Sequence, residues 1–139
     1  MAVQIRLMRI GDYSGAYSLW KCLPGMGLSR ADEFENIKIF LRKNPKTCFI
    51  AEEHDRLIGT VLGGSDGRRG YIYHLAVHPE FQRRGIGKQL IQNCLEAFRN
   101  QDIMKCHIFV ISSNREGIKF WKKIGWVMRD DILVMSREL

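Results

Sequence analysis

The residues best suited to chemistry lie in one short stretch, where two glycines and three cations follow an apolar segment. Gly85 and Gly87 flank the predicted start of a helix, and the cations beside them are Arg83, Arg84 and Lys88. The first N–H groups of a helix lack partners within it, and the helix dipole attracts phosphate to that end. Glycine lets an anion approach the backbone because no Cβ stands in the way. The stretch therefore predicts a phosphate-binding turn, to which the cations add charge-assisted contacts.

Two other phosphate-binding motifs are excluded by neighbouring residues. A P-loop needs Ser or Thr after Gly-Lys, whereas Gly87 and Lys88 are followed by Gln89. A dinucleotide fingerprint needs Gly or Ala where this chain has Leu90, and the loop over 79–84 is too long for it. A glycine-containing loop with solvated arginines is the remaining alternative.

Metal chemistry is not indicated by the cysteines and histidines. The four cysteines are widely spaced without a C-x-x-C pair, and no histidine joins them in a metal-ligand spacing. Each cysteine has apolar neighbours, so we expect buried, reduced thiols and no metal site. The residues concerned are Cys22, Cys48, Cys94, Cys106, His54, His74, His78 and His107.

Hydrophobic periodicity predicts the elements that must position this turn. Period-two and short apolar runs predict strands, and apolar residues at helical spacing predict helices. A capping-box pattern at Ser29 and Asp32 opens the second helix, and one over 113–116 opens the fourth. The predicted strands cover 3–10, 47–53, 57–62, 70–78, 106–111, 126–129 and 132–136, and the helices 12–23, 29–44, 85–99 and 113–125.

This order of elements predicts an α+β fold in one domain, residues 1–139. Hairpin-connected strands pair antiparallel, whereas a strand, helix and strand across residues 70–111 require a parallel crossover. We therefore expect a mixed, mostly antiparallel sheet of six to seven strands flanked by four helices.

Composition narrows the classes of function. The chain has 139 residues, a net charge of +7 and 45% hydrophobic residues, as one globular domain would. Its apolar runs are far shorter than the roughly 18 residues of a membrane helix, and residues 1–10 lack the apolar core of a signal peptide. A cytoplasmic location is the expectation. The positive charge suits polyanions, but nucleic acid is disfavoured because the densest basic cluster lies on the glycine turn.

The same stretch resembles the acetyl-coenzyme A signature of the GNAT superfamily of N-acetyltransferases. The resemblance rests on V-x-P-x-x-Q-R-R-G-I-G over 77–87 after a strand, and on F-W-K-K-I-G-W over 120–126. The order of elements agrees along the whole chain, and the length is similar to that of small single-domain members. The resemblance implies the GNAT fold, acetyl-coenzyme A as co-substrate and a primary amine as acceptor.

The resemblance also implies roles for individual residues. Main-chain N–H groups of the glycine turn would hold the pyrophosphate of the coenzyme. Main-chain groups of Leu75 and Val77 would pair with the pantetheine arm, and the Val77 N–H would stabilise the oxyanion. Asn114 would contact the pantetheine side. The turn residues implied are Arg83, Arg84, Gly85, Ile86, Gly87 and Lys88.

The implied reaction is direct attack by the amine within a ternary complex. An aliphatic amine has a pKa of roughly 10.4, so a base must remove a proton first. His74 is the leading candidate, because histidine titrates nearest neutrality. Tyr73 is a second candidate and could also protonate the leaving thiolate, because Trp121 replaces the family's usual tyrosine. The other candidate bases are Tyr71 and, through water, Glu52 or Glu53.

Three questions stay open at this point. The acceptor is a small-molecule or peptide amine that the sequence does not name. We also expect a homodimer, because dimers are common in the family that the sequence resembles. The alternative functions are a catalytically weak acyl-coenzyme A-binding module, which Trp121 keeps open, and, with less support, a basic nucleic-acid-binding domain.

Overall fold

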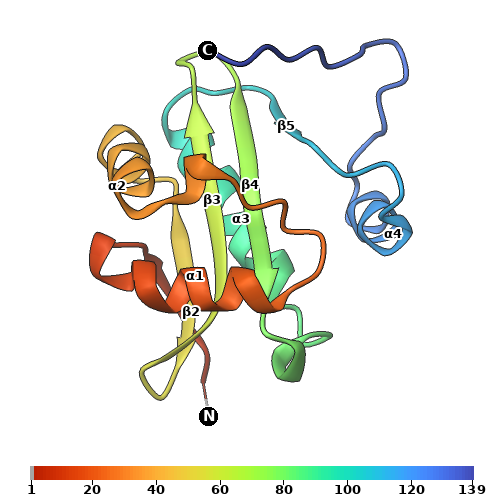
Figure 1. Ribbon diagram of the computed structural model, residues 1–139. Helices are drawn as coiled ribbons and strands as arrows, with labels where there is room; N and C mark the ends of the chain where they lie inside the picture. Colours follow the sequence, from red (N-terminus) through yellow and green to blue (C-terminus); the bar gives the residue numbers. More distant parts are fainter. Residues whose placement is uncertain (1) are drawn as a thin grey trace. The chain divides into compact units, whose positions relative to one another are not determined.

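The computed structural model describes residues 2–139 (Figure 1). Their contacts divide the chain into two compact units, Met1–Phe109 and Val110–Leu139. The first unit holds all the strands and three of the four α-helices, and the second unit holds the last helix. The expectation of one domain over residues 1–139 stays a prediction.

The sheet has five strands in the order β1-β2-β3-β4-β5. The first four pair antiparallel in sequence order, and β4 pairs with β5 in parallel. The parallel pair follows from the helix that lies between β4 and β5 in the chain. The mixed, mostly antiparallel sheet of the sequence prediction is therefore confirmed. The strands are β1 (Gln4–Leu7), β2 (Phe49–Glu53), β3 (Arg56–Ser65), β4 (Gly70–Val77) and β5 (Cys106–Ile108).

Helices cover both faces of this sheet in the first unit. α1 (Tyr13–Cys22) and α2 (Phe34–Lys43) lie on one face, and α3 (Ile86–Asn100) lies on the other (Figure 1). Successive glycines of β3 show the two sides. A Cβ on Gly63 would meet Cys94 and Phe98 of α3, whereas one on Gly64 would meet Phe40 of α2. The sheet is thus the middle of three layers.

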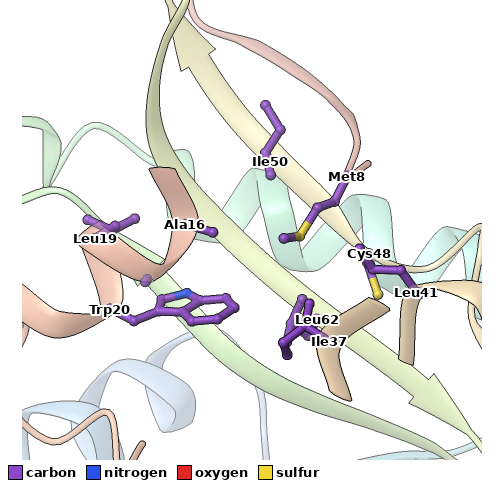
Figure 2. Close-up of a cluster of buried hydrophobic side chains, with 10 residues drawn as sticks. Met8, Ala16, Leu19, Trp20, Ile37, Leu41, Cys48, Ile50 and Leu62 are labelled. Carbon is purple, nitrogen blue, oxygen red and sulfur yellow. The ribbon is translucent and has the colours of Figure 1, made fainter. Parts of the chain in front are cut away.

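The core beneath α1 and α2 positions the middle of β3 and β4. Buried side chains from both helices meet apolar residues of the sheet there (Figure 2). Trp20 of α1 is fully buried in this cluster, which also contains Ile50 of β2 and Leu62 of β3. Apolar residues at helical spacing in α1 and α2 thus anchor the helices to this face, as the periodicity predicted.

The number of strands is a correction to the sequence prediction. The predicted strands over 126–129 and 132–136 are not strands, so the described residues form five strands instead of six to seven. Alternating apolar residues indicate that one face of a segment can be buried, but they do not determine which strand the segment pairs with. Several of these side chains are instead largely exposed: Val127, Leu133, Val134 and Met135.

The second unit contains α4 (Arg115–Lys123), which begins where the sequence predicted but with a different cap. The predicted capping box started at Ser113. The structure places Asn114 at the N-cap, where its side-chain oxygen accepts a hydrogen bond of 2.9 Å from the N–H of Gly117. Asparagine is as good an N-cap as serine, so pattern alone did not separate the two positions.

Candidate active site

A bulge in β4 gives the candidate site its shape. Thr60 of β3 pairs with Ala76 and Leu62 pairs with Tyr73, so two residues of β4 oppose one residue of β3. His74 lies in the bulge with φ of 46°, in the left-handed region that non-glycine residues rarely adopt. A bulge bends its strand and re-aims a side chain. Here it directs the His74 ring toward α1.

The His74 ring is fixed on two sides. Its Nε2 lies 2.6 Å from Oδ1 of Asp32, and its ring centroid lies 4.7 Å from that of Trp20. A carboxylate only accepts hydrogen bonds, so Nε2 is the donor, and in the neutral ring Nδ1 then carries the lone pair. Nδ1 has no hydrogen-bond partner among residues 2–139. The ring is therefore oriented as a base, with one nitrogen held and the other available.

Asp32 is itself anchored by the turn that joins α1 to α2. Its carboxylate also accepts from the N–H of Ser29 at 2.9 Å, and its carbonyl accepts from the hydroxyl of Tyr13 at 2.7 Å. The Ser29–Asp32 capping box predicted from sequence is confirmed, but it caps a short 3-10 turn over Arg30–Asp32. The second helix, α2, begins at Phe34 and not at residue 29 as predicted. Sequence reasoning missed the contact with His74, because a capping box indicates only a local role for its acidic residue.

Two consecutive hydrogen bonds connect the backbone of the bulge to α1. The indole N–H of Trp20 donates to Oγ1 of Thr60 at 2.8 Å, and that hydroxyl donates to the carbonyl of His74 at 2.8 Å. Trp20 and Thr60 are both fully buried. The Thr60 hydroxyl therefore links the indole of Trp20 to the backbone of His74.

Replacing Thr60 with valine is expected to lower the free energy of unfolding by about 2 kcal/mol, because it leaves a buried donor and acceptor unpaired. Urea titration followed by circular dichroism measures the change. Thr60→Ser keeps the hydroxyl and serves as the matched control, with a smaller loss. Equal stability of Thr60→Val and wild type would contradict this account of the bulge.

One edge of β4 is open beyond the bulge. Among the described strands, β5 pairs with β4 only over 70–72, so no strand covers that edge of 73–77. The N–H of His78 donates to Ile58 of β3, so alternation points the N–H and C=O of Val77 toward the open edge. The side chain of Gln82 confirms this direction, because its Nε2 donates to the Val77 carbonyl at 3.0 Å. The sequence places Gln82 in the glycine-turn motif but did not predict its contact with Val77.

The predicted phosphate turn leads from this edge into α3. Arg83 and Gly85 both have left-handed backbones, with φ of 66° and 79°, and Gly85 is the N-cap of α3. Left-handed residues in a turn direct neighbouring N–H groups into one concavity that suits anions. A Cβ on Gly85 would meet nothing within 4 Å, so the space before the turn is open. This geometry fits a phosphate group.

Arg84 is pre-positioned beside the turn. Its guanidinium lies 5.1 Å from the ring centroid of Phe81, which is buried. Arg56 lies over the same ring at 5.6 Å. Stacking restricts the Arg84 side chain while leaving its N–H groups free to donate. Arg83, Gly87 and Lys88 complete the turn that the sequence predicted.

Tyr73 is suited to donate a proton. Burial, followed by the neighbouring Tyr71 and Cys106, raises the pKa of its phenol above the ordinary value of 10.0. The phenol therefore stays protonated near neutral pH. Its ring is 38% exposed and lies next to Phe40 of α2.

Glu52 and Glu53 lie away from this group of residues. They are in β2, and β3 separates that strand from β4. The carboxylate of Glu52 accepts from Nε of Arg6 at 3.1 Å, and Arg6 also bridges to Asp12. The structure thus gives Glu52 a partner in a structural ion-pair network and does not bring it to His74.

Asn114 and Trp121 belong to the second unit. The Asn114 side chain caps α4, and the Trp121 ring packs edge-to-face on Trp126 at 4.9 Å between centroids. These contacts give both residues a structural role within their unit. Their roles toward the coenzyme stay predictions.

Three further observations concern the rest of the described chain. Residues 2–139 hold no cluster of three or more His, Cys, Asp or Glu side chains that could bind a metal ion. No helix in this range has the length and apolar character needed to cross a membrane. A groove of about 960 Å³ lies between α3 and the edge of the sheet, and it shares no residue with the candidate site.

Comparison with known proteins gives consistent findings. The model of the "Acetyltransferase (GNAT) family" matches residues 14–126. An acetyltransferase of Pectobacterium atrosepticum is 30% identical over 135 residues, 97% of this chain and 95% of that protein. The PaiA N-acetyltransferase of Thermoplasma acidophilum, solved with coenzyme A, superposes with a TM-score of 0.82 at 20% identity over 94% of this chain and 92% of that one. AAC(6')-Iy, solved with a coenzyme A bisubstrate analogue, gives 0.81 at 18% identity over 100% of both chains.

Proposed function

Because the chain belongs to the GNAT family of acetyltransferases, we propose that it transfers the acetyl group of acetyl-coenzyme A to a primary amine by direct attack. The observation that carries the proposal is the open edge of β4, which runs from the His74 bulge to the glycine turn. In this proposal the base, the N–H of Val77 and the phosphate-binding turn would lie along one continuous segment.

The coenzyme would lie along this segment in two parts. The main-chain groups of Leu75 and Val77 would pair with the amide groups of the pantetheine arm. The N–H groups of the turn over 83–88 would hold the pyrophosphate, with Arg84 adding charge-assisted hydrogen bonds. Acetyl-coenzyme A supplies the activated thioester in this complex.

His74 would act as the base in the transfer. Its Nδ1 accepts a proton from the attacking amine while Asp32 stabilises the imidazolium that forms. The amine nitrogen then bonds to the carbonyl carbon, and the Val77 N–H donates to the oxygen that becomes negative. The bond from carbon to sulfur breaks, and Tyr73 donates its phenolic proton to the thiolate. The Tyr73 phenolate then regains a proton from solvent, and the His74 imidazolium releases one to solvent, so that both groups are restored. The products are an N-acetylated amine and coenzyme A.

The acceptor is a small-molecule or peptide amine in this proposal. The cytoplasmic location and the homodimer remain predictions. Trp121 keeps the weak binding module as the second candidate, because indole is a poorer acid than the family's usual tyrosine.

An acetylation assay tests the proposal. The protein is incubated with acetyl-coenzyme A and a panel of primary amines, and both thiol release and the mass of each amine are measured. We expect thiol release that depends on the amine and matches the amount of acetylated product. The matched control is Arg99→Gln, which removes an exposed positive charge from the last turn of α3. This variant is expected to keep wild-type rates. Tight coenzyme binding without any acetylated amine would indicate the binding module instead.

A further inference from the structure

Neighbouring positions of β4 and β5 carry aromatic side chains in matched rows on one face of the sheet. Tyr71 pairs with His107 in the parallel register, with ring centroids 5.7 Å apart. Two residues after Tyr71 and His107 come Tyr73 of β4 and Phe109, which follows the last residue of β5, and their ring centroids are 6.4 Å apart. Tyr71 also stacks on Tyr73 and on Phe109, at 6.5 and 6.1 Å. These four side chains form an aromatic ladder of two rungs.

The ladder is accessible at the rung nearer the active site. Tyr73 is 38% exposed and Phe109 is 59% exposed. The alternate residues Ile72 and Gly70 are buried, and a Cβ on Gly70 would meet Phe98 of α3. The ladder therefore lies on the face opposite α3, where Phe40 of α2 contacts Tyr73. Adjacent exposed aromatic rings form an apolar surface patch, and such patches often mark binding sites.

Two cations stand at the far end of the ladder. Arg69 and Lys105 precede Tyr71 and His107 by two residues each, and the N–H of Gly70 donates to the Lys105 carbonyl at 3.0 Å. The guanidinium of Arg69 donates to the backbone carbonyl of Arg68 at 3.3 Å and has no carboxylate partner among residues 2–139. The nearby Asp66 accepts from the N–H groups of Arg68 and Arg69 through Oδ1, and its Oδ2 lies 3.8 Å from the guanidinium of Arg68.

We propose that the acceptor of this enzyme is an extended acidic peptide, whose amine lies at His74 and whose chain follows the ladder toward Arg69 and Lys105. This inference rests on the proposed acetyl transfer. The rungs repeat every two residues, the period at which side chains of an extended peptide return to one face. An apolar or aromatic side chain near the amine would contact Tyr73 and Phe109. A carboxylate further along would meet the two cations.

The same charges disfavour polycationic acceptors. A second ammonium group near Arg69 and Lys105 would face like charge, in a molecule whose net charge is already +7. Complementary charge also raises the rate of encounter with acidic partners. An acidic peptide would therefore be attracted by Arg69 and Lys105, whereas a polyamine bound in the same position would be repelled by them.

Competing synthetic peptide amides test this inference. The first has phenylalanine at its second and fourth positions and glutamate at its sixth. The second has lysine at the sixth position, and the third has alanine in place of both phenylalanines. We expect kcat/KM for the first to exceed that for the second by roughly tenfold at low salt, because two exposed charge pairs each contribute little. Salt is expected to reduce the ratio by screening.

Variants of the protein locate the effect. Arg69→Gln combined with Lys105→Gln is expected to bring the ratio of glutamate to lysine peptides close to one. The Arg99→Gln control keeps the wild-type ratio. Tyr73 is avoided as a variant because it also serves the reaction.

The outcomes separate the inference from the proposed function. Equal rates for the first two peptides, or a preference for lysine or for spermidine, would overturn the acidic-peptide inference and leave acetyl transfer intact. Acetylation of phenethylamine but of no peptide would do the same. Absence of transfer to every amine, with acetyl-coenzyme A still bound, would overturn the proposed function and the inference together.

Discussion

Replacing Gly87 with valine is expected to weaken coenzyme A binding about 100-fold or more. Gly87 lies in the first turn of α3, where the helix N–H groups are free to bind phosphate. A branched side chain at this position separates the anion from the backbone. Each charge-assisted hydrogen bond contributes roughly 1.5–3 kcal/mol, so the loss of two accounts for the change. Isothermal calorimetry with coenzyme A measures it.

The matched control for Gly87→Val is Gln89→Val. Gln89 is exposed in the same helix, and its N–H is already bonded to the carbonyl of Gly85 at 3.0 Å. Both variants place a valine in α3, and only the one at residue 87 puts it beside the predicted phosphate position. Wild-type affinity in a folded Gly87→Val variant would contradict the placement of the pyrophosphate.

Replacing His74 with glutamine is expected to reduce kcat by a factor of roughly 10²–10⁴, the usual contribution of general acid–base catalysis. Glutamine retains a donor for the Asp32 carboxylate but has no group that takes up a proton near neutral pH. The binding of acetyl-coenzyme A should stay close to wild type, because the turn over 83–88 is unchanged. Steady-state rates across a pH series, alongside calorimetry, separate the two effects.

Asp32→Asn is the companion variant for His74→Gln. An asparagine oxygen still accepts from His74 but no longer stabilises the imidazolium, so we expect a smaller loss of kcat than in His74→Gln. A His74→Gln variant with the wild-type kcat and pH profile would assign the base to another group.

The local parts of the site were predictable from sequence, and the long-range parts were not. The glycine turn is one continuous segment whose helix start, glycines and cations all lie within a few residues, so pattern alone located it. The contact between His74 and Asp32 joins residues that are 42 positions apart. It depends on the bulge in β4, and bulges leave little trace in hydrophobic alternation.

The sheet shows the same division. Strands β1 to β4 were predicted because their apolar runs are bounded by turns, and each strand pairs with its neighbour in sequence. β5 was expected to run to residue 111 but ends at Ile108. The alternating apolar residues after α4 predict strands, but these residues pair with no strand among the described residues. Pairing is decided by which strands meet in space, and sequence period does not contain that information.

The most direct test of the proposed site is a titration of the ¹⁵N-labelled protein with coenzyme A, followed by backbone amide chemical shifts. The account predicts that the largest changes occur at Leu75, Val77 and the amides of 85–88, with the Gln82 side-chain amide also affected. Amides lining the groove at 95–101 should change little. Large changes in that groove with an unperturbed Val77 and glycine turn would contradict the account.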